Sequence, residues 1–298
     1  MRATYNSLAF CHDSKPVLAV CFALCALLIN APAQTNANSA KPNSVGDDVR
    51  RLIPSNVSNS RTNQSEPSHV GSYSVEKNFR AAQKKSRGEP RNNEAAWRFA
   101  RAAFDFAEVA KNDGKREQIA NEGIYACRQV IEREHTNAAA HYYLAMNLGQ
   151  VARTKSLGAL KLVNEMEREW GLAGSFDEKF DYAGSDRNLG LLYLEAPGWP
   201  VSIGSRSKAK QHLQRAVELA PDYPENHLNL MDAWLKWGDR KKLEREMKTF
   251  EELLPKAKTE FAGEEWESSW ADWDARWKKI KAKAAELPKT IQSPAQKK

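Results

Sequence analysis

Residues 209–255 read AKQHLQRAVELAPDYPENHLNLMDAWLKWGDRKKLEREMKTFEELLP. Two helical patterns in this stretch share one spacing, lie 34 residues apart and each end at a proline: Ala209, Leu213, Ala216 and Pro221 recur as Leu243, Met247, Phe250 and Pro255. Between them, residues at offsets 0, 3, 4 and 7 fall on one face of a helix: His227, Leu230, Met231 and Trp234. Self-similarity at this period predicts stacked pairs of helices.

The spacing resembles the tetratricopeptide (TPR) repeat, in which a first helix crosses a second closely at small residues. Ala209 and Ala216 occupy such positions, and Pro221 ends the second helix because it lacks an N–H group. Earlier copies appear once insertions are allowed: Trp97, Ala100, Arg101 and Phe104 with Gly123, Cys127, Val130 and His135; His141, Leu144, Ala145 and Leu148 with Ala159, Val163, Met166 and Gly171; and Leu189, Leu192, Tyr193 and Ala196. The sequence therefore predicts an all-α fold, a TPR-like helical repeat solenoid of about four helix pairs over residues 73–257.

The last expected helix, residues 258–287, carries one continuous apolar stripe. Its members follow one another at spacings of 4, 3, 4 and 3: Trp266, Trp270, Trp273, Trp277 and Ile280. A solenoid needs its terminal face covered, so this segment is expected to be a capping helix. A tryptophan-lined ligand channel is the alternative interpretation. Residues 288–298 are expected to form a disordered basic tail.

The first segment has the pattern of a secretory signal peptide. Arg2 and Lys15 precede the apolar run VLAVCFALCALLIN (17–30), and Ala31-Pro32-Ala33 is a small-residue cleavage site. We expect residues 1–33 to be removed and the protein to be exported, periplasmic or secreted, with no membrane span after cleavage. Lipid attachment is disfavoured because Val20 and Leu24 precede the cysteines of the run. Residues 34–72, rich in Asn and Ser, predict a disordered leader.

Patterns that indicate catalysis are weak, and we expect no enzyme. Gly198-x5-Gly204-Ser205-Arg206 lacks the spacing, the lysine and the strand of a phosphate-binding loop. No cofactor and no metal are expected, since the chain has no H-E-x-x-H motif and no cysteine pair in the exported part. Cys127 fills a large apolar position, which favours a buried thiol. The formal net charge of +7 is spread among acidic residues, so we expect no nucleic-acid partner.

Two long connections depart from the repeat, at residues 171–188 and 196–204. The second, APGWPVSIG, contains no His, Asp, Glu or Cys, so no general base lies within it. Its prolines stiffen the backbone and present an indole, which favours recognition, gating over a groove or contact between protomers. The candidate binding residues are Trp199, Pro197, Pro200 and Ser202, with Arg187 and Tyr193 before them. Alternatively, Trp199 packs against its own repeat.

Residues 154–163 and 182–230, together with the TPR spacing, resemble the T-component (TatT-like) family of periplasmic TPR proteins associated with tripartite ATP-independent periplasmic (TRAP) transporters. The resemblance covers roughly residues 95–255 and is most specific from Asp186 to Asn229. It implies a helical repeat body, trimeric with an internal channel in some members, that acts beside a solute-binding protein. The same fold occurs in eukaryotic TPR proteins linked to microtubule dynamics. This chain lacks the lipid-attachment signal.

Two functions follow as expectations. The first is a non-enzymatic accessory to periplasmic solute uptake that holds a small organic solute or contacts a solute-binding protein. The second is a protein-interaction scaffold of the cell envelope that binds a peptide or helix in its concave groove. Either one allows a homo-oligomer. An enclosed apolar channel would favour the first function, and an open polar groove would favour the second.

Overall fold

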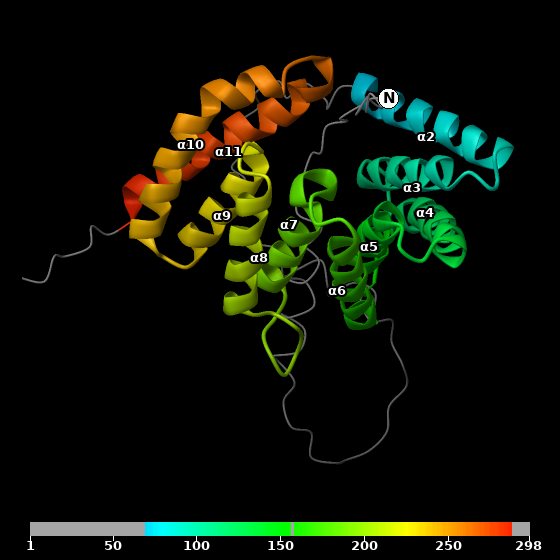
Figure 1. Cartoon of the computed structure of the whole chain (residues 1–298), viewed down its shortest axis with the longest axis horizontal. Coiled ribbons are helices and arrows are strands. Elements are labelled where there is room, and N and C mark those ends of the chain that lie inside the picture. The colour runs from blue at the N-terminus through cyan, green and yellow to red at the C-terminus, as the bar shows by residue number, and fades with distance from the viewer. Residues whose placement is uncertain (1–68, 156–157, 288–298) are drawn as a thin grey trace, which may run out of the picture.

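The computed structural model describes residues 69–155 and 158–287. This part is all-α, and it contains no strand beyond one isolated bridge. The helices follow one another in an arc with α2 and α3 at one end and α10 and α11 at the other (Figure 1). Their bounds are α2 His69–Gly88, α3 Asn93–Glu108, α4 Asp113–Arg133, α5 Ala138–Ala152, α6 Ala159–Phe176, α7 Phe180–Glu195, α8 Arg206–Leu219, α9 Pro224–Lys236, α10 Arg240–Glu260, the 3-10 helix η2 Glu264–Trp266 and α11 Glu267–Glu286.

The predicted helix pairs are α3 with α4, α5 with α6, α7 with α8, and α9 with α10. Each helix contacts the next in the chain, and α3, α5, α7 and α9 also contact one another in that order. Asparagine side chains set the start of three helices, because Asn92, Asn112 and Asn137 each accept a hydrogen bond from a first-turn N–H at 2.9–3.0 Å. The predicted helical repeat architecture is confirmed.

The close crossings expected in the third pair are also confirmed. Ala209 and Ala216 are fully buried. A Cβ atom added to Gly190 of α7 would lie 2.6 Å from Cγ of Leu213 on α8, so the two backbones approach closely only because Gly190 has no side chain. Cys127 is fully buried as predicted, and burial raises the pKa of its thiol.

The C-terminal cap is confirmed with altered boundaries. Trp266, Trp273, Trp277 and Ile280 are buried, and α11 packs on α9 and α10. These four members of the stripe belong to the core and only Trp270 is half-buried, which contradicts the alternative of a tryptophan-lined channel. Pro255 does not end a helix, because α10 continues to Glu260. Buried Leu253 and Ala257 keep that last part of α10 against the core, which offsets the hydrogen bond that proline loses.

Three further boundaries differ from the prediction. Gly171 lies inside α6, which runs to Phe176, so the long connection expected at 171–188 is mostly helical. The helix α2 begins at His69, so the last four residues of the expected leader are helical. The expected signal peptide, the leader up to residue 68 and the tail 288–298 lie outside the described residues. None of the described helices combines the length and the apolar composition that a bilayer crossing needs.

Candidate functional site

The connection between α7 and α8, which we call the Trp199 loop (residues 196–204), is closed by its own backbone. The N–H of Gly204 donates to the carbonyl of Pro197 at 2.7 Å, and the N–H of Ser205 donates to the carbonyl of Tyr193 at 2.9 Å. Gly204 is required at this point, since an added Cβ atom would lie 2.0 Å from the carbonyl oxygen of Ala196. The loop is thus a braced element that begins and ends on the scaffold.

The indole of Trp199 is presented to solvent, with 89% of the residue exposed. The alternative that Trp199 packs against its own repeat is therefore wrong. Pro200 is also exposed, and Pro197 and Ser202 are half-buried in the same loop. The loop projects from α7 and α8 on the side away from the two ends of the arc (Figure 1). This position fits a contact with another molecule rather than gating over the inner side of the arc.

Tyr193 supports the loop from beneath and does not share its surface. Besides the backbone bond to Ser205, its hydroxyl donates to Glu167 of α6, and the ammonium of Lys208 lies 4.7 Å from its ring centroid. Burial and the bond to Glu167 raise the pKa of Tyr193 above its usual value, so the phenol stays protonated. The side chain fixes α8 and the end of the loop onto α6 and α7.

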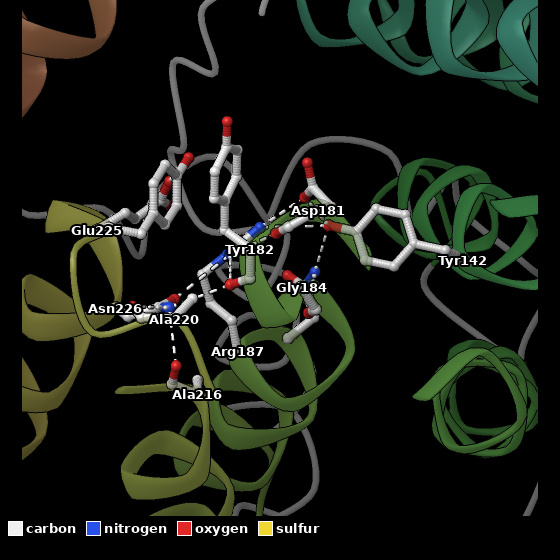
Figure 2. A network of polar contacts seen from close by, with 11 residues as sticks. Tyr142, Asp181, Tyr182, Gly184, Arg187, Ala216, Ala220, Glu225 and Asn226 are labelled. Carbon is white, nitrogen blue, oxygen red and sulfur yellow. Dashed lines mark hydrogen bonds and ion pairs between the residues drawn. The ribbon is translucent and has the colours of Figure 1, made fainter. Parts of the chain in front are cut away.

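Arg187 belongs to a separate network of polar contacts between α5, α7 and α9 (Figure 2). Its buried guanidinium donates to the Asp181 carboxylate at 2.6 Å and to the carbonyls of Asp181 and Tyr182 at 3.0 and 3.1 Å. It also contacts Asn226 at 3.3 Å. Tyr142 donates to the same carboxylate at 2.6 Å. Arg187 is a buried organising residue, and it lies away from the loop that Trp199 occupies.

The network holds a turn of unusual backbone geometry. Asp181, Tyr182 and Ala183 have φ values of 52°, 54° and 61° with ψ values of 46°, 51° and 38°, so three consecutive non-glycine residues are left-handed. Such a conformation costs about 1–2 kcal/mol per residue. Arg187 offsets this cost by binding two carbonyls and one carboxylate of this left-handed turn (residues 181–183).

The left-handed turn joins the two hydrophobic cores of the molecule. Phe180, just before it, packs at 5.3 Å against the ring of Tyr142 in the N-terminal core. Tyr182 stacks on Tyr223 of the C-terminal core, with centroids 4.4 Å apart and planes within 9°. Right-handed residues in these places would turn the two rings in other directions, so the turn sets how the two halves of the arc meet.

Sequence reasoning missed the partners of Arg187. Tyr142 directly follows His141 in α5, and Asn226 directly precedes His227 in α9. Helical periodicity assigns both residues to a helix but does not show that their polar atoms contact a neighbouring repeat. The signal in the sequence was that both side chains can form hydrogen bonds and lie beside the positions that define the repeat.

Two histidines at equivalent repeat positions make the same pair of contacts. His141 contacts Glu169 at 2.5 Å through Nδ1 and the carbonyl of His135 at 2.9 Å through Nε2. His227 does the same with Glu246 at 2.6 Å and the carbonyl of Pro221 at 2.7 Å. In each case one ring nitrogen contacts a carboxylate and the other contacts a backbone carbonyl. The first pair joins α5 to α6, and the second joins α9 to α10.

The arrangement offers binding surfaces and structural networks. In the part of the chain that the structure describes, no three His, Cys, Asp or Glu side chains gather to hold a metal ion. Tyr142 and Tyr223, whose ring centroid lies 5.3 Å from the Arg187 guanidinium, are buried, and burial raises the pKa of both well above the usual range. They therefore act as hydrogen-bond donors at neutral pH.

A sequence model of the family "Regulator of microtubule dynamics protein 1-3" (RMD1-3) matches residues 63–162. Over roughly a third of its length, the chain is similar to RMD1-3. No curated protein matches the sequence. The matched region runs from before α2 to residue 162, so it includes the first helix pair, α5 with Tyr142, and only the first four residues of α6. It ends before Asp186–Asn229, the stretch on which the resemblance to TRAP T-components depends most.

Proposed function

We propose that this protein is a non-enzymatic scaffold that binds a partner protein through the Trp199 loop. The observation that carries the proposal is the 89% exposure of Trp199 on a loop braced by the Gly204–Pro197 and Ser205–Tyr193 backbone bonds. An aromatic side chain held in place loses little conformational entropy on binding, which is why such residues dominate interface energetics. The rest of the repeat body then serves as a rigid support.

The inner side of the arc supports a scaffold better than a solute carrier. Asp181 and Tyr182 are half-buried and lie on the side of α7 that faces the two ends of the arc (Figure 2). Polar and charged groups in this position differ from the apolar channel that a carrier of organic solutes needs. Similarity to RMD1-3, a family named for regulating microtubule dynamics, is in keeping with a role in binding other proteins.

The second candidate is an accessory to periplasmic solute uptake of the TRAP T-component type. It is favoured by the resemblance over Asp186–Asn229, which contains the Trp199 loop itself. On that function the partner of the loop is a solute-binding protein or a second copy of the chain. Both candidates place the protein outside the cytoplasm if residues 1–33 act as a signal peptide.

The test is site-specific photo-cross-linking in cells that produce the full chain. A benzophenone amino acid replaces Trp199 in one strain, and in a control strain it replaces Tyr125, an aromatic residue of α4 that is 68% exposed. We expect a discrete adduct from position 199 that is absent from position 125. Mass spectrometry of the adduct then tells a different protein from a second copy of the chain.

The partner found in this way is used to measure affinity. Trp199→Ala should weaken its binding by about 1–3 kcal/mol, as for an aromatic at the centre of an interface, while Tyr125→Ala leaves it unchanged. The circular dichroism of both variants should match the parent. Loss of helix in Trp199→Ala, or equal adducts from both positions, would contradict the proposal.

A further inference from the structure

An open pocket of about 570 Å³ lies at the turn between α10 and α11, and we call it the cap pocket. It is separate from the Trp199 loop and from the Arg187 network. Aromatic rings and charged side chains line it: Phe261, Trp270, Lys258, Glu264, Glu267 and Asp274. A pocket that combines an aromatic wall with several carboxylates is suited to a cation.

Local structure explains why these residues converge. Gly263, with φ of 115°, turns the chain back after α10, which a residue with a side chain would resist. Along α11, Glu267, Trp270 and Asp274 are three and four residues apart and share one face. The indole N–H of Trp270 donates to the carbonyl of Phe261 at 2.7 Å. The half-buried ring is therefore fixed in place as a wall of the pocket.

The pocket already holds an ammonium group of the protein itself. Nζ of Lys258 lies 5.5 Å from the centroid of the Trp270 ring, within the range of a cation–π interaction. In the described part of the chain, no ion pair joins Lys258 to an acidic residue or joins Glu264, Glu267 or Asp274 to a basic one. The ionisable groups that line the cap pocket are thus three carboxylates and one ammonium. The pocket is therefore locally acidic, although the whole chain has a formal net charge of +7.

We propose that the cap pocket binds an alkylammonium group, and that Lys258 occupies the aromatic wall when no ligand is bound. The ring attracts the cation at short range, and the three carboxylates attract it over a longer distance. The group can belong to a lysine side chain of a partner protein, a source that rests on the proposed scaffold function, or to a free quaternary amine. The pocket itself stands on its own geometry.

The test is a nuclear magnetic resonance titration of the full chain labelled with ¹⁵N-tryptophan. The probes are tetramethylammonium chloride and Nα-acetyl-lysine amide, and the controls are sodium chloride at equal ionic strength and the neutral Nα-acetyl-norleucine amide. We expect a saturating shift of the Trp270 indole N–H with both cations and none with the controls. Tighter binding of the lysine amide points to a protein ligand, and tighter binding of tetramethylammonium points to a free amine.

Two variants separate the pocket from general surface charge. Lys258→Gln removes the internal competitor and should tighten probe binding about two- to fivefold, the range expected for one exposed cation–π contact. Lys248→Gln, with the same charge change on the same helix but outside the pocket, should have no effect. The proposal is overturned if neither cation gives a saturating shift, or if the two variants behave alike. Neither result bears on cross-linking at Trp199.

Discussion

The left-handed turn predicts an inverted response to glycine at Ala183. Ala183 and Ala145 are both fully buried, but Ala145 lies within the right-handed helix α5 and Ala183 has φ of 61°. Replacing either alanine with glycine removes the same buried methyl group, at a cost of about 0.8 kcal/mol. The two variants therefore differ mainly in what glycine does to the backbone.

The expected magnitudes follow from these backbone conformations. In α5, glycine adds the usual helix penalty of about 1 kcal/mol, so Ala145→Gly should destabilise the fold by about 2 kcal/mol together with the lost methyl. At Ala183, glycine removes the cost of a left-handed residue, about 1–2 kcal/mol, so Ala183→Gly should be neutral or slightly stabilising. The two free energies of unfolding should differ by at least about 2 kcal/mol.

Thermal unfolding followed by circular dichroism measures this difference. For a protein of this size, 2 kcal/mol corresponds to a gap in Tm of roughly 4–8 °C, with Ala183→Gly the higher. Arg187→Met is the companion variant, because it removes the hydrogen bonds to the carbonyls of Asp181 and Tyr182 and the ion pair with the Asp181 carboxylate. It should lower the free energy of unfolding by about 3–5 kcal/mol. Equal loss of stability in Ala183→Gly and Ala145→Gly would show that the turn is not left-handed.

Three further predictions concern pH, packing and export. Burial lowers the pKa of His141, but its bonds to Glu169 and to the His135 carbonyl outweigh this and raise the pKa overall. The stability that this pair contributes should be complete below about pH 6.5, the unfolded value, and should decline as the pH rises through the folded pKa. A series of melting curves should show this decline, and Glu169→Gln should remove it. Ala216→Trp or Ala209→Trp should unfold the third helix pair, since overpacking costs about 1–3 kcal/mol or more, and an unchanged Tm would show that the helix register is wrong. N-terminal sequencing of the exported protein should find Gln34 first, and a lipid on a cysteine of the apolar run would refute this.

The fold was predictable because each helix pair buries a face with a period of 3.6 residues. Ala209 and Ala216 recur at the crossing of α7 and α8, and the structure buries both completely. Such positions report packing directly, since only a small side chain fits there. Helix ends were harder to predict. Pro255 is a helix breaker by its chemistry, yet Leu253 and Ala257 on either side are buried and hold α10 together through it.

The loop at residues 196–204 was predictable, because its two prolines and two glycines disfavour a helix, but the sequence left open whether Trp199 is exposed or packs against its own repeat. The left-handed turn was not predictable. Asp181, Tyr182 and Ala183 include no glycine, and ordinary local preferences favour right-handed geometry for all three. Their conformation depends on Arg187 and on Tyr142, which lies 39 residues earlier in the chain. A contact between repeats, invisible to periodicity, decides the backbone there.

Both departures from the repeat flank the same helix. The left-handed turn precedes the right-handed part of α7, and the Trp199 loop follows its end. The turn faces the inner side of the arc, whereas the loop projects on the opposite side (Figures 1 and 2). The helix α7 contacts α5, α6, α8 and α9. A partner bound at Trp199 would therefore contact the end of the helix whose start sets how the two cores meet. The third helix pair is therefore where recognition and the alignment of the two halves meet.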